Sequence, residues 1–270
     1  MRLAGSLHTQ SEVTDMHQPT PVPPTIVLVH GAFTDASSWA GVISLLRAAG
    51  SRVCAPANPL RGLTQDAAYI RSVVRDVGVP VVLVGHGYGG AVITHAATDG
   101  DNVVALCYVA AFGLDAGECL LDITNRFAAM PVADAIFTAA LPTLFPGGSD
   151  AELYIREERF PQVYAADLPS RVKNVMSVAQ RPIARSALTG RSGAPAWVTK
   201  PSWYAVATAD QVLNPTAQRF MAQRMAATER VLHGSHAVVL SQPGAVAAMI
   251  REAAGQDAGR GDGNGLRHTL

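Results

Sequence analysis

The sequence has few cysteines, little charge and no long apolar run. Its 270 residues include only three cysteines, Cys54, Cys107 and Cys119, which are too few and too widely spaced for a disulfide framework or a Cys-x-x-Cys metal site. Charged residues make up 16% of the chain, and 21 basic side chains balance 21 acidic ones, so no net field favours nucleic acid or an anionic bilayer. No apolar run reaches the roughly 18 residues of a membrane-spanning helix. We therefore expect a small, largely uncharged substrate as the partner, with no nucleic acid and no membrane.

The two ends differ in composition from the middle of the chain. Residues 1–24 are polar and end in a proline-rich stretch, which predicts a flexible N-terminal segment. They also lack the apolar core of a secretory signal peptide, so we expect a cytoplasmic protein with reduced thiols. The glycine-rich residues 255–270 predict a flexible tail. No metal or organic cofactor is implied, and the oligomeric state stays open.

Between the ends, short apolar runs alternate with amphipathic stretches. The runs predict strands at 26–29, 52–55, 81–84, 103–109, 203–207 and 230–232, and the stretches predict helices at 38–49, 65–77, 88–97, 216–226 and 243–254. This alternation is typical of a parallel sheet covered on both faces by right-handed crossovers. We predict a doubly wound α/β core of about six mainly parallel strands, formed by residues 25–113 and 201–254.

The alternation breaks over residues 114–200. There, proline- and glycine-containing segments interrupt helix-like pieces, and we interpret this stretch as a mostly helical cap inserted after the fourth strand. Ligands of such sheets bind outside the carboxyl ends of the strands, so a cap at that edge would cover the ligand. Phe112, Phe137 and Phe145 are candidate substrate-binding side chains.

One turn lacks a residue that its motif requires. Residues 85–89 read Gly-His-Gly-Tyr-Gly between an apolar run and a helical stretch, which is the strand-turn-helix context of the Gly-x-Ser-x-Gly nucleophile elbow. The flanking glycines avoid β-carbons that would clash where strand and helix close together. Gly87 stands where the nucleophilic serine belongs. The motif is complete in shape and lacks its hydroxyl.

The same glycines also fit the Gly-x-Gly-x-x-Gly fingerprint of dinucleotide-binding proteins. That fingerprint normally belongs to the first strand-helix unit and needs an acidic residue about 20 positions further on. Residues 106–109 read Leu-Cys-Tyr-Val and offer no carboxylate. The sequence disfavours nucleotide binding.

Three further motifs accompany the elbow. An apolar strand is followed by His-Gly-Ala-Phe at 30–33, a later strand ends at Asp210, and the loop after the last strand carries His236. With these motifs the chain resembles a small α/β-hydrolase of the carboxylesterase and lactonase type, over roughly residues 25–254. The order of position 87, Asp210 and His236 agrees with the order nucleophile, acid and histidine of that fold.

The resemblance implies a role for each residue. Ala32, with Phe33 beside it, and the residue after the elbow, Tyr88, would supply the N–H groups of an oxyanion hole. Tyr88 also begins a helix whose dipole favours negative charge. Asp210 would fix the tautomer of the His236 imidazole and stabilise its positive charge.

Each assignment has an alternative. Asp210 is also placed to cap a helix or form a surface turn, and His233 is a second candidate for the base. Cys119 is a conceivable replacement nucleophile, although nothing in the sequence brings it to His236.

Three functions remain open. The first is an esterase inactivated at position 87, naturally or by engineering, which binds a small ester or lactone but has lost acyl-enzyme hydrolysis. The second is a native serine-less enzyme whose His236–Asp210 pair acts as a general base beside the oxyanion hole, on water or in non-hydrolytic chemistry. The third is a non-catalytic module that binds a small ligand.

Overall fold

The computed structural model of the protein describes residues 22–97, 102–141 and 150–256. Phe145 and most of the two predicted flexible ends lie outside these ranges. Within them, no helix is long and apolar enough to cross a membrane, and all three cysteines are free thiols.

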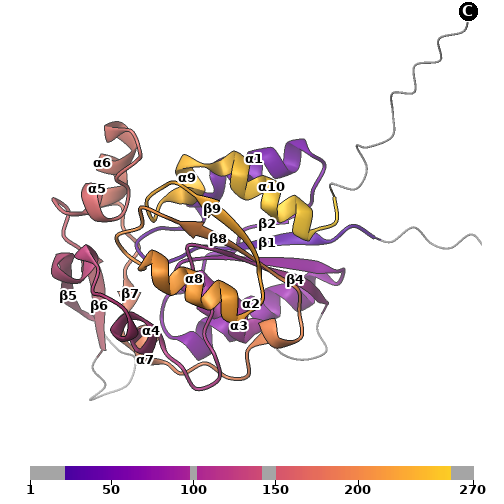
Figure 1. Ribbon diagram of the computed structural model, residues 1–270, viewed down its shortest axis with the longest axis horizontal. Coiled ribbons are helices and arrows are strands. Elements are labelled where there is room, and N and C mark those ends of the chain that lie inside the picture. Colours follow the sequence, from indigo (N-terminus) through magenta and orange to yellow (C-terminus); the bar gives the residue numbers. More distant parts are fainter. Residues whose placement is uncertain (1–21, 98–101, 142–149, 257–270) are drawn as a thin grey trace, which may run out of the picture.

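The core is a six-stranded sheet in the order β2-β1-β3-β4-β8-β9. Every neighbouring pair of strands is parallel, so the predicted doubly wound sheet is confirmed (Figure 1). The strands are β1 (Thr25–Val29), β2 (Val53–Cys54), β3 (Val81–His86), β4 (Val103–Val109), β8 (Ser202–Ala207) and β9 (Thr228–Leu232).

Helices cover both faces of this sheet (Figure 1). One face carries α1 (Ala40–Ala48), preceded by η1 (Ala36–Trp39), together with α9 (Val238–Ser241) and α10 (Pro243–Ala253). The other carries α2 (Leu63–Val77), α3 (Tyr88–Ala96) and α8 (Pro215–Arg224).

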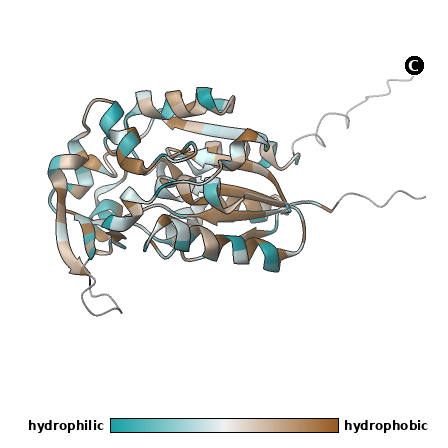
Figure 2. Ribbon diagram, turned by 90° about the horizontal axis from the view of Figure 1, so that it is seen from below, coloured by the Kyte–Doolittle hydropathy of each residue, from teal (hydrophilic) through white to brown (hydrophobic). Residues whose placement is uncertain are grey.

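The strand sequences explain why the sheet needs two helical layers. Successive side chains of a strand point to opposite faces. In β1, Ile26 and Leu28 belong to one hydrophobic cluster and Val27 and Val29 to the other, and all four are fully buried. Figure 2 accordingly shows hydrophobic strands in the middle of the molecule and helices of mixed hydropathy on either side. Continuous apolar runs are what a parallel sheet buried on both sides requires.

The segment between β4 and β8 forms short elements, most of which lie together at one end of the sheet (Figure 1), while the last of them packs against α3. The helices are α4 (Leu120–Arg126), η2 (Pro131–Ala135), α5 (Phe160–Val163), α6 (Ser170–Val178), α7 (Arg185–Thr189) and η3 (Ala196–Val198). The strands β5 (Ile136–Leu141), β6 (Asp150–Ile155) and β7 (Ile183–Ala184) form an antiparallel sheet.

The sequence predicted a mostly helical cap in this segment and did not predict the small sheet. Strand β5 ends in Ala-Ala-Leu, and alanine and leucine favour helices in isolation. Its six residues instead pair with all six residues of β6. Pairing between the strands outweighs the local preference for helix here, because a weak intrinsic propensity is readily overridden by tertiary context.

Gly85 allows α3 to pack closely against the end of β3. A Cβ built on Gly85 would lie 2.6 Å from the carbonyl group of Gly89 and the nitrogen of Gly90. We expect Gly85→Ala to lower the free energy of unfolding by about 1–3 kcal/mol, because backbone atoms must move to admit the methyl group. Urea denaturation measures this loss.

Gly244→Ala is the matched control. Gly244 lies inside α10, and a Cβ there would meet nothing within 4 Å. Alanine is a better helix former, so this variant should be as stable as the parent or more stable, by up to about 1 kcal/mol. Equal stability of the two alanine variants would contradict the packing argument.

Candidate active site

Gly87 adopts the backbone conformation of a strained elbow. Its φ is 53° and its ψ is −120°, a region that glycine enters at little cost and other residues enter only under constraint. The Gly87 N–H donates to the Val109 carbonyl at 3.3 Å, and the Gly87 carbonyl accepts from the N–H of Phe112 at 3.0 Å and of Gly90 at 3.2 Å. These bonds to the end of β4 and the first turn of α3 hold the elbow without any side chain at position 87.

Asp210 and His236 are in direct contact. Asp210 follows β8, His236 lies in the loop after β9, and Nδ1 of the imidazole is 2.7 Å from Asp210 Oδ2. The His236 side chain is only 4% exposed and the Asp210 side chain 0%. Because Asp210 occupies Nδ1, the imidazole is held with Nε2 as its second, chemically available nitrogen.

The remaining lone pairs of Asp210 are also used. Oδ1 accepts from the N–H groups of Val212 at 2.7 Å and Leu213 at 2.9 Å, and Gln218 Nε2 donates to Oδ2 at 2.8 Å. The turn-forming role considered as an alternative for Asp210 therefore coexists with its contact to His236. The other histidine of that loop, His233, is exposed, and its Nδ1 lies 3.0 Å from the Thr208 hydroxyl.

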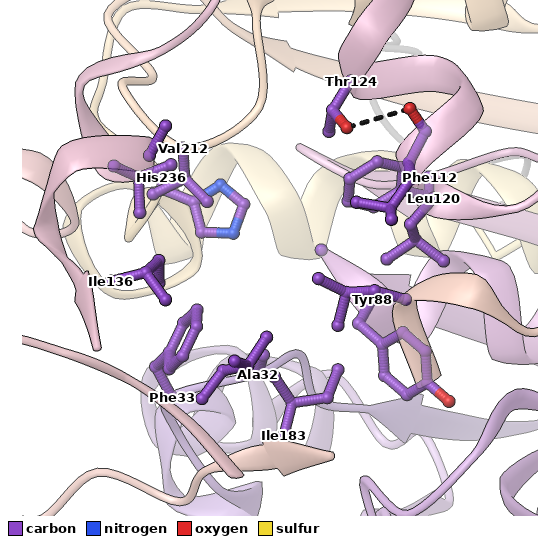
Figure 3. Close-up of a pocket in the computed structure, with 16 residues that line it drawn as sticks. Ala32, Phe33, Tyr88, Phe112, Leu120, Thr124, Ile136, Ile183, Val212 and His236 are labelled. Carbon is purple, nitrogen blue, oxygen red and sulfur yellow. Dashed lines mark hydrogen bonds between the residues drawn. The ribbon is translucent and has the colours of Figure 1, made fainter. Parts of the chain in front are cut away.

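His236 stands directly over the elbow. A Cβ built on Gly87 would lie 3.0 Å from Nε2 and 3.5 Å from Cε1 of His236. A serine side chain at position 87 would therefore reach the nitrogen that Asp210 leaves available. Figure 3 shows the imidazole at the wall of the cavity, facing the side chains that line it.

The loop after β1 is fixed by buried polar contacts. His30 is fully buried, and its Nε2 accepts from the Asn58 N–H at 3.0 Å while Nδ1 lies 2.9 Å from the Gly31 carbonyl. Burial lowers the pKa of His30, which keeps the ring neutral and able to accept. The Tyr164 hydroxyl, from the residue after α5, donates to the Ala32 carbonyl at 3.2 Å.

Of the residues expected around an oxyanion, Ala32 and Tyr88 line the cavity beside Gly87. Phe33 lines it as well, with φ at 62°, but its N–H donates to the Arg181 carbonyl at 2.9 Å. Phe33 can thus contribute its ring and not its amide. Ala32 and Tyr88 remain the candidate amide donors.

The Tyr88 ring points away from the cavity (Figure 3), and its hydroxyl is bound to the buried carboxyl of Asp66. Its hydroxyl donates to Asp66 Oδ2 at 2.7 Å, and the same carboxyl accepts from the N–H groups of Arg61 and Gly62. Burial and the neighbouring Asp66 hold the pKa of Tyr88 well above its ordinary value. A protonated hydroxyl that donates to Asp66 fixes the first residue of α3 in place.

His86 supports His236 from the core side. It is fully buried, its Nε2 lies 2.9 Å from the His236 carbonyl, and the two rings are 4.7 Å apart between centroids. Burial, and then the adjacent His236, hold the pKa of His86 well below its ordinary value. A neutral His86 donates to the loop that carries His236 without adding charge.

A cavity of about 330 Å³ opens beside Gly87 and His236. Among the described residues, its lining includes no charged side chain, and the only polar ones besides His236 are Tyr88, which is bound to Asp66, and Thr124, which donates to the Leu121 carbonyl. Such a surface favours an apolar, uncharged ligand. The lining residues are Ala32, Phe33, Gly87, Tyr88, Phe112, Leu120, Leu121, Thr124, Val132, Ala133, Ile136, Leu153, Ile183, Leu188, Val212 and His236.

The three phenylalanines expected at the substrate have different positions. Phe112 lines the cavity. Phe137 does not, because on the outer strand β5 its ring is 39% exposed and stacks on Tyr154 at 5.3 Å. Phe145 lies outside the described residues. Cys119 is buried at the start of α4 and is not part of the lining.

Sequence reasoning missed the residues that contact the site from parts of the chain remote in sequence. Tyr164 packs its ring 5.0 Å from that of His236, and Asp167 accepts from the N–H and hydroxyl of Ser235 in the same loop. Neither belongs to a motif. Asp66 has the position of an ordinary acidic residue in the first turn of α2, so its bond to Tyr88 could not be inferred from spacing. Among the described residues, no cluster of side chains has the composition of a metal site.

Comparison with known proteins agrees with this architecture. A model of the Alpha/beta hydrolase family matches residues 26–249. No curated protein matches the chain in sequence. In structure the chain is similar to polyneuridine aldehyde esterase, with 17% identity and a TM-score of 0.74 over 86% of this chain and 99% of that one.

Two other solved structures are similar to the same extent. A pyrethroid hydrolase from Sphingobium faniae shares 22% identity and a TM-score of 0.69 over 87% of this chain and 98% of its own. A methylesterase from Arabidopsis shares 20% identity and a TM-score of 0.68 over 86% of this chain and 99% of its own. At these identities the likeness establishes the fold alone.

Proposed function

Because the chain belongs to the alpha/beta hydrolase family, we propose that its cavity binds a small, apolar, uncharged ester or lactone. Asp210 and His236 form the acid and base of the hydrolytic site, and the N–H groups of Ala32 and Tyr88 form its oxyanion hole. Acyl-enzyme hydrolysis is lost, because Gly87 supplies no hydroxyl to attack the carbonyl carbon.

One observation carries this proposal. The position where a Cβ of residue 87 would lie is 3.0 Å from Nε2 of an imidazole whose other nitrogen is bound to a buried carboxylate. A receptor has no need of that arrangement, whereas nucleophile activation depends on it. Two of the structurally similar proteins are named as an esterase and a methylesterase, which is consistent with an ester as ligand.

Binding can be tested on the protein as it stands. Leu121 lines the cavity and is 37% exposed, so Leu121→Asp should fold and should place a carboxylate against the ligand. We expect phenyl butyrate to bind the parent and be recovered intact. Leu121→Asp should raise the dissociation constant about tenfold or more, because an apolar contact is replaced by a group that must stay solvated.

Isothermal titration calorimetry measures the change, and Leu45→Asp is the matched control. Leu45 is an exposed leucine of α1, 44% accessible and remote from the cavity lining. Equal weakening by both variants, or no binding to the parent, would contradict the proposed ligand site.

A second function is favoured by the orientation of His236. Nδ1 is bound to Asp210 and Nε2 faces the cavity beside Gly87. The pair is therefore arranged as a general base that takes a proton from a bound molecule. In this alternative the glycine is native, and the site activates water or moves a proton of the substrate. Loss of the natural turnover in His236→Ala would support it.

A further inference from the structure

Tyr164, the residue that follows α5, contacts both halves of the candidate site. Its ring lies edge-on to the His236 imidazole, with 5.0 Å between the centroids, and its hydroxyl donates to the Ala32 carbonyl at 3.2 Å. Tyr164 is 1% exposed and is not part of the cavity lining, so it acts on a ligand only through its neighbours. We propose that Tyr164 is a positioning residue, a role that rests on the proposed ester site: it holds the oxyanion donor Ala32 and the base His236 in a fixed relation to each other.

The peptide that joins Ala32 to Phe33 is fixed at both of its polar groups. Its carbonyl accepts from the Tyr164 hydroxyl, and its N–H, from Phe33, donates to the Arg181 carbonyl at 2.9 Å. Phe33 has a φ of 62°, a conformation that a bulky residue keeps only where its surroundings impose it. The Tyr164 hydroxyl makes one of the hydrogen bonds that impose it.

The preceding peptide, between Gly31 and Ala32, is fixed at its carbonyl and has an available amide. The Gly31 carbonyl lies 2.9 Å from His30 Nδ1, which carries the ring proton because Nε2 accepts from the Asn58 N–H. Within the described part of the chain, the Ala32 N–H donates to no internal partner. The two peptides share the Ala32 Cα, so the bond from Tyr164 to the second peptide also restricts the direction of this N–H.

The same segment holds the backbone on both sides of His236. The Tyr164 carbonyl accepts from the Ala237 N–H at 3.0 Å, and Asp167 accepts from the Ser235 N–H at 3.1 Å and from the Ser235 hydroxyl. Residues 164–167 therefore connect the loop of the base with the loop of the oxyanion donor. An oxyanion hole stabilises the transition state only when its donors are in place beforehand. This connection should therefore matter for the reaction and much less for binding of the intact ester.

Amide hydrogen exchange tests the positioning in the protein as it stands. Tyr164→Phe removes the hydroxyl and keeps the ring, so the Phe33 amide should exchange roughly two- to tenfold faster, the effect of one hydrogen bond. Binding of phenyl butyrate should change by less than about twofold, because the oxyanion donors act mainly in the transition state. Tyr154→Phe is the matched control. The Tyr154 hydroxyl donates to Glu152 on β6, outside the cavity lining, and its loss should leave Phe33 exchange unchanged.

Kinetics in the Gly87→Ser background test the consequence for the reaction. There, Tyr164→Phe should lower kcat for 4-nitrophenyl butyrate about tenfold and leave KM within about twofold, whereas Tyr154→Phe should change neither. The expected loss is smaller than the roughly 10²- to 10³-fold of removing an oxyanion donor itself, because Tyr164 acts through the donor. A general loosening of the site would raise KM as well.

The outcomes separate the role of Tyr164 from the proposed function. Unchanged Phe33 exchange in Tyr164→Phe, or full kcat when Tyr164→Phe is added to an active Gly87→Ser protein, would overturn the positioning role and leave the ester site intact. A folded but inert Gly87→Ser protein would overturn the proposed function, and with it any role of Tyr164 in catalysis. Faster Phe33 exchange in that case would show that the hydroxyl bond is real and serves the stability of the loop alone.

Discussion

Gly87→Ser is expected to raise the hydrolysis of short-chain aryl esters by up to roughly 10⁶-fold, the amount lost when the nucleophile is removed from a working triad. The elbow already has the backbone angles of a nucleophile position, so no loop has to rearrange. The new Cβ would lie 3.0 Å from His236 Nε2, and the ring must yield by a few tenths of an ångström toward the open cavity. Release of 4-nitrophenol from 4-nitrophenyl acetate and butyrate measures the gain.

Gly87→Ala is the control for this change. It introduces the same Cβ at the same backbone angles and has no hydroxyl. Any effect of backbone stiffening or of displacing His236 should therefore appear in both variants, and only serine should gain activity. A serine variant that is folded and inert toward both esters and lactones would contradict the proposed site.

His236→Ala in the Gly87→Ser background should return hydrolysis to the level of the parent. Members of a triad act as a unit, so removing the base costs about as much as removing the nucleophile, roughly 10⁶-fold where this has been dissected. Asp210→Asn should cost less, about 10⁴-fold, because the geometry survives while the tautomer is wrong. Values of kcat and kcat/KM for the same aryl esters test both changes.

His233→Ala provides the comparison within the same loop. His233 is exposed and contacts Thr208 instead of Asp210. The serine variant should keep its activity when His233 is removed. A large loss from His233→Ala, or retained activity in His236→Ala, would show that the base has been assigned to the wrong histidine.

The sheet could be predicted because its signals are local and repeated. Each buried strand reads as an apolar run, as Val81–His86 does before the elbow, and each crossover helix has its own amphipathic pattern. Parallel strands joined by helices then leave little choice of topology. The small antiparallel sheet of β5, β6 and β7 could not be inferred in this way, because its strands are short, partly exposed and rich in helix-forming residues.

The residues of the candidate site also differ in whether a local sequence signal predicts them. Gly87, Asp210 and His236 could be singled out because each follows a predicted strand in a fixed order, and the structure places the last two 2.7 Å apart. Phe137 was chosen for its residue type alone, and strand pairing turns it away from the cavity. Tyr164 follows α5 and contacts the Ala32 carbonyl and the ring of His236, which are far from it in the sequence. Contacts of that kind depend on how the elements pack and have no signature in the sequence.

Covalent labelling tests the central claim most directly. A fluorophosphonate reacts with a serine hydroxyl only when a base activates it and an oxyanion hole receives the phosphoryl oxygen. Mass spectrometry of the intact protein should show no adduct on the parent or on Gly87→Ala, and one adduct on Gly87→Ser that maps to position 87. An unlabelled but folded serine variant, or an adduct on the parent, would contradict the account.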